Sequence, residues 1–463
     1  MVKRGGEIRA TARVRGGHDN DPVSRDLAHG LEILGLATTR YMVDALAEYF
    51  RIARPPGNER GSLAGNASAI ARSERFLDTI CDRIASVPLV GERRLAARWA
   101  ARRVLDHGWT VAQAARLVGG LDWGSAAKAA RAVDQLSDPA RRFAVRYSMT
   151  DSLAERILSE FTPEEAEALG SALDAEPVTT LRANRLKTTR DALLEELNTA
   201  GHDVSPGLLS TDAIRVDNPS DLFRLSAFKE GRFEVQDEGS QLVAELVAPP
   251  PGRVVVDFCA GAGGKSLALA AALGGRGQVI ALDLPRVERK LAELRRRVRR
   301  AGAGNVMVRA LVEDGSLPES LSQWTARCDR VLVDAPCSGL GTLRRNPELK
   351  LRLDRNALDR LPLQQTQILD RAATLVGPGG RLIYAVCTLF HAETDAIVDR
   401  FLAAHPDFQL MPTKEILGKA RAVPLGGGDR LRLLPHVHAT DGFFAAVLRR
   451  GGVPAAGAGA VQT

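Results

Sequence analysis

The second half of the chain contains five short apolar runs rich in β-branched residues, and a segment of helical character separates each run from the next. The runs are VVVDF (254–258), QVIALD (278–283), NVMVRAL (305–311), RVLVDA (330–335) and RLIYAV (381–386), and FFAAVLRR follows as a late strand. Strands that alternate with helices build a mostly parallel sheet with helices on both faces. The pattern therefore predicts a C-terminal α/β Rossmann-like domain over residues 231–450.

The sequence ahead of this domain has a helical period. From Ser24 to about Leu136 apolar residues recur at intervals of three and four, and no alternating β-branched run interrupts them. We expect an all-α domain of about five helices over residues 23–136. One face of it is rich in arginine and consists of Arg93, Arg94, Arg98, Arg102 and Arg103.

A small α+β module is predicted between these domains, over residues 137–230. It begins with two short helices, the second of which opens with a Thr-Pro pair typical of a helix N-terminus. A strand (179–186), a helix (188–201) and a short strand (213–217) follow. The predicted fold is therefore multi-domain, with an all-α domain, a small α+β module and a Rossmann-like domain in that order.

Composition limits the classes of protein to which the chain can belong. Residues 1–22 and 451–463 are rich in glycine and have no apolar period, so we interpret them as a disordered basic arm and a disordered tail. The five cysteines are scattered and form no CxxC pair, which excludes a disulfide scaffold and argues against a metal site. No apolar run reaches the roughly 18 to 20 residues that span a bilayer. We expect a cytoplasmic monomer without a membrane partner.

The first strand of the predicted sheet leads into a glycine-rich turn and then a helix. The turn consists of Cys259, Ala260, Gly261, Ala262, Gly263, Gly264 and Lys265. Glycine lets backbone amides approach a ligand at the C-terminal edge of such a sheet. Asp283, Asp314 and Asp334 follow the next three strands, and the first of them can accept hydrogen bonds from both hydroxyls of a ribose. Acidic side chains suit a cationic nucleoside better than a dinucleotide, so the pattern favours S-adenosylmethionine as the cofactor. The alternative is that these carboxylates and glycines are ordinary loop residues without a ligand.

Two cysteines follow neighbouring strands of the same sheet. Cys337 comes after Pro336 at the end of the fourth strand, and Cys387 ends the fifth. Either cysteine alone would more often be a small buried apolar residue. Together, beside a nucleoside-binding loop, they favour a thiolate nucleophile, the species that attacks electron-poor rings. On position alone, either cysteine could be that nucleophile.

The segments FCAGAGGKS, LVDAPCSGLGTLRRNP and YAVCT are similar to motifs of the Sun/RsmB family of S-adenosylmethionine-dependent RNA cytosine-C5 methyltransferases. FAVRYSMTDSLAERILSEF, TTLRANRLKTTRD, FEVQDEGSQLVAEL and DGFFAAVLRR resemble other segments of that family in the same order, so the similarity covers about residues 143–450. Three departures are visible. Val386 and Thr388 flank a cysteine that the family usually places between Thr and Ser, Glu393 precedes Thr394 instead of Asn, and Gly261-Ala262 replaces Ala-Pro.

The resemblance implies roles for the residues at the predicted site. Residues 259–265, with Asp283, Asp314 and Asp334, would hold the cofactor. Cys387 would be the nucleophile that attacks C6 of the cytosine, and Cys337 would assist release of the product. An acid near N3 would stabilise the addition, and Asp334 is the nearest candidate for that contact.

The resemblance also implies an RNA partner, and the arginine-rich charge surplus of +7 is compatible with one. The members that act on 16S ribosomal RNA carry a NusB-like RNA-binding domain ahead of the same core, and residues 23–136 are predicted to be such a domain. Transfer RNA is the alternative substrate, and a non-catalytic RNA-binding protein is the alternative function. The predicted RNA contacts are Arg182, Asn184, Arg185 and Lys187 in the small module, and Arg344 and Arg345 beyond Cys337.

Overall fold

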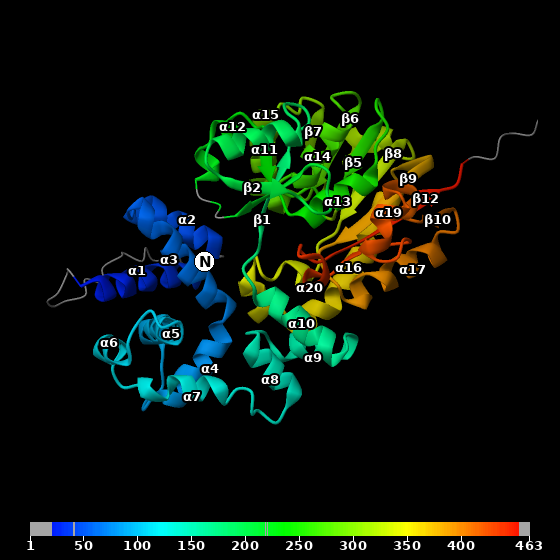
Figure 1. The fold of residues 1–463 in the computed structure, drawn as a ribbon. Coiled ribbons are helices and arrows are strands. Elements are labelled where there is room, and N and C mark those ends of the chain that lie inside the picture. Colours follow the sequence, from blue (N-terminus) through cyan, green and yellow to red (C-terminus); the bar gives the residue numbers. More distant parts are fainter. Residues whose placement is uncertain (1–20, 40–41, 218, 220, 453–463) are drawn as a thin grey trace, which may run out of the picture. The chain divides into compact units, whose positions relative to one another are not determined.

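The computed structural model describes residues 21–39, 42–217, 219 and 221–452 (Figure 1). The chain divides into two compact units, and the boundary between them lies after Gln135. The predicted disordered arm falls almost entirely on residues outside the described ranges, and so do residues 453–463 of the predicted tail.

The N-terminal unit is all-α in its described part, apart from one isolated bridge between Ala85 and Leu121. Its α-helices are α1 (Pro22–Ala37), α2 (Met42–Ala53), α3 (Gly57–Arg72), α4 (Glu74–Ile84), α5 (Gly91–Leu105), α6 (Val111–Leu117) and α7 (Ala126–Arg131). The expectation of about five helices is wrong, because α6 and α7 span only seven and six residues and periodicity is weak over so short a window. The class, however, is as predicted.

The arginine-rich face of this unit is largely paired with carboxylates. Arg98 Nε lies 2.7 Å from Asp78 Oδ1 on α4, Arg102 Nε lies 2.6 Å from Asp106 Oδ2, and Arg103 Nε lies 3.1 Å from Asp26 Oδ2 on α1. The pairs with Asp78 and Asp26 tie α5 to α4 and α1. The guanidinium groups of these three arginines therefore already have counter-charges within the unit.

Three helices open the C-terminal unit: α8 (Pro139–Arg146), α9 (Asp151–Glu160) and α10 (Pro163–Asp174). Thr162 caps α10 in a reciprocal arrangement with Glu165, as the Thr-Pro pair predicts. The apolar faces of these helices share one core with Leu340, Leu343, Leu389 and Phe390, which follow the fourth and fifth strands of the large sheet. The helices therefore pack against the predicted Rossmann-like domain and support its loops.

A four-stranded antiparallel sheet follows, in the order β2-β3-β1-β4. Its elements are β1 (Thr179–Ala183), α11 (Arg190–Thr199), β2 (Asp203–Pro206), β3 (Ala213–Asp217), α12 (Ser226–Lys229) and β4 (Phe233–Val235). β2 and β4 were not predicted, because runs of four and three residues carry no clear alternation. β4 pairs with β1, so the small sheet extends beyond the predicted boundary at residue 230.

The large sheet has the order β10-β12-β9-β8-β5-β6-β7, and β11 pairs with β12. Its strands are β5 (Val254–Asp257), β6 (Gln278–Asp283), β7 (Val306–Ala310), β8 (Cys328–Asp334), β9 (Val376–Val386), β10 (Phe408–Met411), β11 (Leu431–Leu433) and β12 (Phe443–Arg450). The run from β9 to β7 is parallel, and β12 lies antiparallel between β9 and β10. The predicted strands are confirmed, whereas β10 and β11 were not predicted.

Helices cover both faces of this sheet, as a Rossmann-like domain requires. One face packs against α16 (Arg355–Ala373) and α17 (Asp395–Ala404), and the other packs against α13 (Glu238–Val247), α14 (Gly264–Ala272) and α15 (Glu288–Ala301). The strand order reverses between β5 and β8, which is where open α/β sheets bind ligands at the C-terminal strand ends. In the described ranges, no helix is both long and apolar enough to cross a bilayer.

Candidate active site

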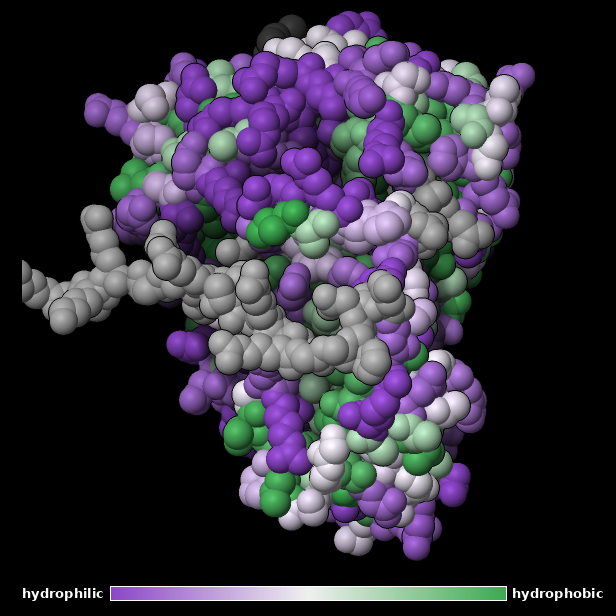
Figure 2. Space-filling model, turned by 90° about the vertical axis from the view of Figure 1, so that its left-hand side faces the viewer, coloured by the Kyte–Doolittle hydropathy of each residue, from purple (hydrophilic) through white to green (hydrophobic). Residues whose placement is uncertain are grey.

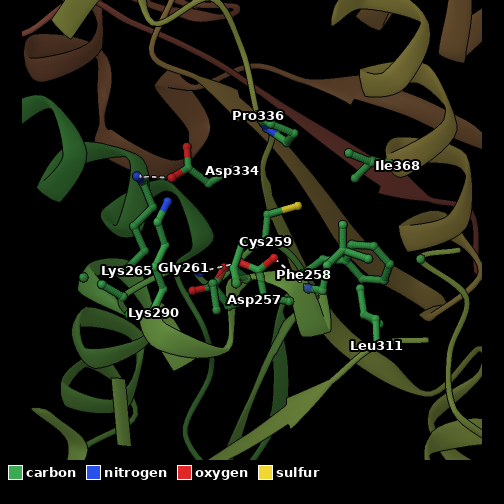
Figure 3. Close-up of a pocket in the computed structure, with 18 of the residues that line it drawn as sticks. Asp257, Phe258, Cys259, Gly261, Lys265, Lys290, Leu311, Asp334, Pro336 and Ile368 are labelled. Atoms are coloured by element: carbon green, nitrogen blue, oxygen red, sulfur yellow. Dashed lines mark hydrogen bonds and ion pairs between the residues drawn. The ribbon is translucent and has the colours of Figure 1, made fainter. Parts of the chain in front are cut away.

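A cleft of about 630 Å³ opens at the C-terminal ends of β5, β6 and β8 (Figure 3). All the residues predicted to hold a cofactor line it: Cys259, Ala260, Gly261, Ala262, Gly263, Gly264, Lys265, Asp283, Asp314 and Asp334. They come from strand ends that lie side by side in the sheet. The structure thus brings this whole predicted set together.

Two glycines give the loop between β5 and α14 its shape. Gly261 and Gly263 have φ angles of +53° and +83°, a region that residues with a Cβ rarely adopt. A Cβ at position 263 would also lie 1.9 Å from Leu294 Cδ1 on α15. The loop can therefore pass close to α15 only with glycine at this position.

Asp283, at the end of β6, holds the loop in place. Its Oδ2 accepts a hydrogen bond from Gly261 N at 2.8 Å, and its Oδ1 accepts one from Leu284 N at 2.7 Å. Each carboxylate oxygen retains a further lone pair. The side chain can therefore fix the glycine loop and also accept hydrogen bonds from a ligand.

Asp257, at the end of β5, is a residue of the cleft that the sequence analysis did not single out. It is 1% exposed, and its Oδ2 accepts a hydrogen bond from Ser266 Oγ at 2.6 Å. Burial raises the pKa of this carboxyl to about 7, although the hydrogen bond from Ser266 acts in the opposite direction. Its Oδ1 has no hydrogen-bond partner among the described residues. The strand-end rule that selected Asp283 and Asp334 would have found it.

Lys265 and Asp334 form an ion pair across the cleft, as Figure 3 shows. Lys265 Nζ lies 2.6 Å from Asp334 Oδ2, and the lysine is 8% exposed. Burial alone would lower the pKa of Lys265, but the charge and hydrogen bond of Asp334 raise it above its ordinary value, and Cys387 adds to that increase. Lys265 is therefore a protonated donor that lies near the second predicted thiol.

The two cysteines meet beside the cleft. Cys337 Sγ lies 3.3 Å from Cys387 Sγ. The strands that carry them are joined by a hydrogen bond from Ala335 N to Ala385 O, and beyond them Gly341 N donates to Cys387 O. The hydrogen bond with Cys387 and burial raise the pKa of the Cys337 thiol well above its ordinary value. At neutral pH, the Cys337 thiol is therefore protonated.

Two predicted RNA contacts of the small module are wrong, because their side chains are buried. Arg182 is 4% exposed and donates to Gln236 and, at 2.7 Å, to the carbonyl of Gly264. Asn184 is 3% exposed and donates to the carbonyls of Gly231 and Ala301. Both residues therefore join the small sheet to the glycine loop and to α15.

The other predicted RNA contacts are also engaged within the chain. Arg344 is buried against Asp441 at 2.7 Å, so its predicted contact with RNA is wrong as well. Arg345 also pairs with Asp441 and is half-buried. Arg185 pairs with Asp212, and Lys187 donates to the carbonyls of Glu230 and Arg300.

Exposed positive charge lies instead on α15 and on the turn before it. The exposed basic residues there are Arg286, Arg289, Lys290, Arg296 and Arg299. Figure 2 shows hydrophilic residues gathered around a hollow in the upper part of one face, at the end where Figure 1 places α12 and α15. Among the described residues, no three His, Cys, Asp or Glu side chains are grouped so that they could hold a metal ion.

Two family models match the C-terminal unit. Residues 244–449 match the model described as 16S rRNA methyltransferase RsmB/F. Residues 151–222 match the model of the ferredoxin-like domain that accompanies RsmF/B-like methyltransferases. The second match covers α9, α10 and most of the small sheet.

Individual proteins agree with these models. The probable ribosomal RNA small subunit methyltransferase B of Bacillus subtilis is 34% identical over 321 residues, which are 69% of this chain and 70% of that protein. The ribosomal RNA small subunit methyltransferase B of Pseudomonas syringae is 33% identical over 297 residues, 64% of each chain. The crystal structure of PH0851 superposes with a TM-score of 0.78 at 26% identity and covers 93% of this chain and 99% of that one.

Proposed function

The chain belongs to the RsmB/F family of RNA methyltransferases, and from this premise we propose that it transfers a methyl group from S-adenosylmethionine to C5 of a cytosine in RNA. The observation that carries the proposal is the pair of thiols 3.3 Å apart beside the cleft. C5 of cytosine is a poor nucleophile until a group adds to C6, and a thiolate is the side chain suited to that addition.

The cleft fits S-adenosylmethionine, a cationic nucleoside. Asp257, Asp283 and Asp334 line it, and the buried Oδ1 of Asp257 needs a partner. We assign the hydroxyls of the ribose to Asp283 and the remaining contacts to residues 259–265 and Asp314. When bound, the cofactor supplies an electrophilic methyl group.

The chain's own groups account for the other steps. The Cys387 thiolate forms a bond to C6, and the electrons of the C5–C6 double bond become available for attack from C5. Lys265, which is held by Asp334, donates a hydrogen bond that stabilises the negative charge developing on the ring near N3. After C5 has received the methyl group, a base removes the C5 proton, and the electrons of that C–H bond restore the C5–C6 double bond as Cys387 leaves as a thiolate. Cys337 is placed to assist this step.

We propose 16S ribosomal RNA as the substrate, because the matched family model is described as 16S rRNA methyltransferase RsmB/F and the relatives are named ribosomal RNA small subunit methyltransferases. Incorporation of labelled methyl from S-adenosylmethionine into ribosomal and transfer RNA tests the reaction class. Bisulfite sequencing of both RNAs, with and without the protein, then locates the cytosine. Methylation of transfer RNA alone would show that transfer RNA, and not 16S ribosomal RNA, is the substrate. No incorporation into any RNA would favour a non-catalytic RNA-binding protein.

Asp283→Ala should weaken cofactor binding, because it removes the acceptor for the ribose and frees the N–H of Gly261. We expect a loss of about 1 to 3 kcal/mol, which is about 5- to 150-fold in Kd. Calorimetry with S-adenosylmethionine measures this, and Glu293→Ala on the outer face of α15 is the control. Unchanged affinity in Asp283→Ala would remove Asp283 from the cofactor site.

We propose that the N-terminal unit is a NusB-like RNA-binding domain. The cofactor cleft is lined only by residues from Val235 onward. Deletion of residues 1–136 should therefore leave the Kd for S-adenosylmethionine nearly unchanged while it weakens RNA binding about tenfold or more, or about 1.4 kcal/mol. Filter binding with 16S ribosomal RNA measures the second quantity. Equal losses of both affinities would show that the unit only supports the fold.

A further inference from the structure

Glu393 lies in the 3₁₀ turn His391–Glu393 that follows β9. It contacts the loop that carries Cys337 and the loop that carries Cys387, which we call the thiol loops. Its side chain is 1% exposed and accepts hydrogen bonds from three neutral donors. Ser338 N lies 2.9 Å from Oε2, Gln365 Nε2 lies 2.8 Å from Oε2, and Thr388 Oγ1 lies 3.4 Å from Oε1. Burial raises the pKa of this carboxyl. A buried carboxylate held only by neutral donors costs stability, so its position calls for an explanation.

The donors explain it, because two of them are the residues that directly follow the thiols. Ser338 follows Cys337, and Thr388 follows Cys387. Ser338 Oγ and Thr388 Oγ1 also lie 2.7 Å apart. Hydrogen bonds thus join the two thiol loops to each other and to a single carboxylate.

Two further contacts fix that carboxylate to the scaffold. Gln365, on α16, donates both to Glu393 Oε2 and, at 3.0 Å, to the carbonyl of Pro336, the residue before Cys337. Tyr384, on β9, donates from its hydroxyl to the backbone carbonyl of Glu393 at 2.8 Å. These hydrogen bonds anchor the turn to α16 and to β9, the strand that directly precedes Cys387.

We propose that Glu393 is a positioning residue that sets the separation and orientation of Cys337 and Cys387 through Ser338 and Thr388. The proposal deepens the proposed function and rests on it. Glu393 itself contacts neither sulfur atom through these bonds. It acts by holding the residue after each thiol in one rigid network.

Glu393→Ala should lower kcat by about 10- to 100-fold, the range expected when reacting groups shift by about 1 Å. KM for S-adenosylmethionine should change little, because the hydrogen bonds of the Glu393 side chain go to Ser338, Gln365 and Thr388, none of which lines the cofactor cleft. Glu393→Gln should recover most of the rate, since an amide oxygen can replace Oε2 and the hydroxyl chain can reverse. Equal losses in the two variants would overturn the proposal, because charge and not positioning would then be required.

A second pair of variants keeps the test valid if Glu393→Ala does not fold. Thr388→Val removes the hydroxyl that links the loops and should lower kcat, and Thr388→Ser should restore it. Thr394→Val is the matched control, since Thr394 is equally buried but donates to the carbonyl of Phe390. Thr394→Val should retain the wild-type rate. If Thr388→Val also retains it, the proposal is wrong.

A measurement without RNA or cofactor reports the thiol geometry directly. Diamide oxidises two neighbouring thiols to a disulfide and takes up the two hydrogen atoms as it is reduced to a hydrazine. Disulfide formation between Cys337 and Cys387, followed by peptide mass spectrometry, should be slower in Glu393→Ala and Thr388→Val than in the wild type and in Thr394→Val. Equal rates in all four proteins would overturn the proposal. If the wild type transfers no methyl group to RNA, the proposed function fails, yet the order of the diamide rates still decides whether Glu393 positions the thiols.

Discussion

Cys387→Ser should abolish methyl transfer and leave no protein linked to RNA, whereas Cys337→Ser should stay linked to RNA after methyl transfer. The two sulfur atoms are 3.3 Å apart, so position does not tell them apart. The resemblance to the Sun/RsmB family assigns the attack to Cys387, and a serine hydroxyl at that position is a far weaker nucleophile than a thiolate. Loss of Cys337 spares the addition to C6 and blocks the release that follows it.

Denaturing electrophoresis with labelled RNA measures both outcomes at once. Cys337→Ser should give a slowly migrating band that depends on S-adenosylmethionine, and Cys387→Ser should give none. Cys328→Ser is the control, because Cys328 is buried at the opposite end of β8 from Cys337. A persistent band in Cys387→Ser instead would exchange the roles of the two cysteines and leave the reaction class intact.

Lys265→Met should lower the rate of methyl transfer by about 10² to 10⁴, the usual contribution of a positioned proton donor. Lys265 is protonated and held by Asp334 beside the thiols, so its loss removes the donor and leaves Asp334 without its counter-charge. Single-turnover kinetics at saturating cofactor isolate this effect.

Lys290→Met provides the matched control, because Lys290 lines the same cleft but is exposed (Figure 3). It should keep a rate close to that of the wild type. By its position in the glycine-rich turn, Lys265 is also predicted to bind the cofactor. A raised Kd for S-adenosylmethionine with an unchanged single-turnover rate would support that assignment and refute a role on the cytosine.

The strands and the strand-end residues were predictable because a parallel sheet places its C-terminal ends along one edge. Spacing therefore sufficed to bring Cys337 and Cys387 together, although their strands are separated by α16. Short elements such as β10 and β11 were not predictable, since they pair with β12 and carry no pattern of their own. Pairing with β12 determines where these two strands form, and the periodicity of the sequence carries no information about that pairing.

Arginine roles were the least predictable part of the site. Arg182 and Arg344 look like phosphate ligands in sequence, but their acceptors are the Gly264 carbonyl and Asp441, which lie far along the chain. An arginine that donates to a buried acceptor cannot be distinguished by sequence from an arginine that is exposed to solvent. Glu393 was missed for a related reason, because its role depends on Ser338 and Gln365 in other segments.

The place of β12 in the large sheet has a consequence for biosynthesis. β9, which ends at the residue before Cys387, lies between β8 and β12, and β12 is the last strand of the sheet to be translated. Until Phe443–Arg450 leaves the ribosome, β9 is an open edge with unpaired backbone groups, a state prone to intermolecular pairing. A nascent chain thus contains both cysteines and the glycine loop before β12 is available to complete the sheet that positions them. The methyltransferase domain can therefore acquire its reactive centre only after Phe443–Arg450 has been translated.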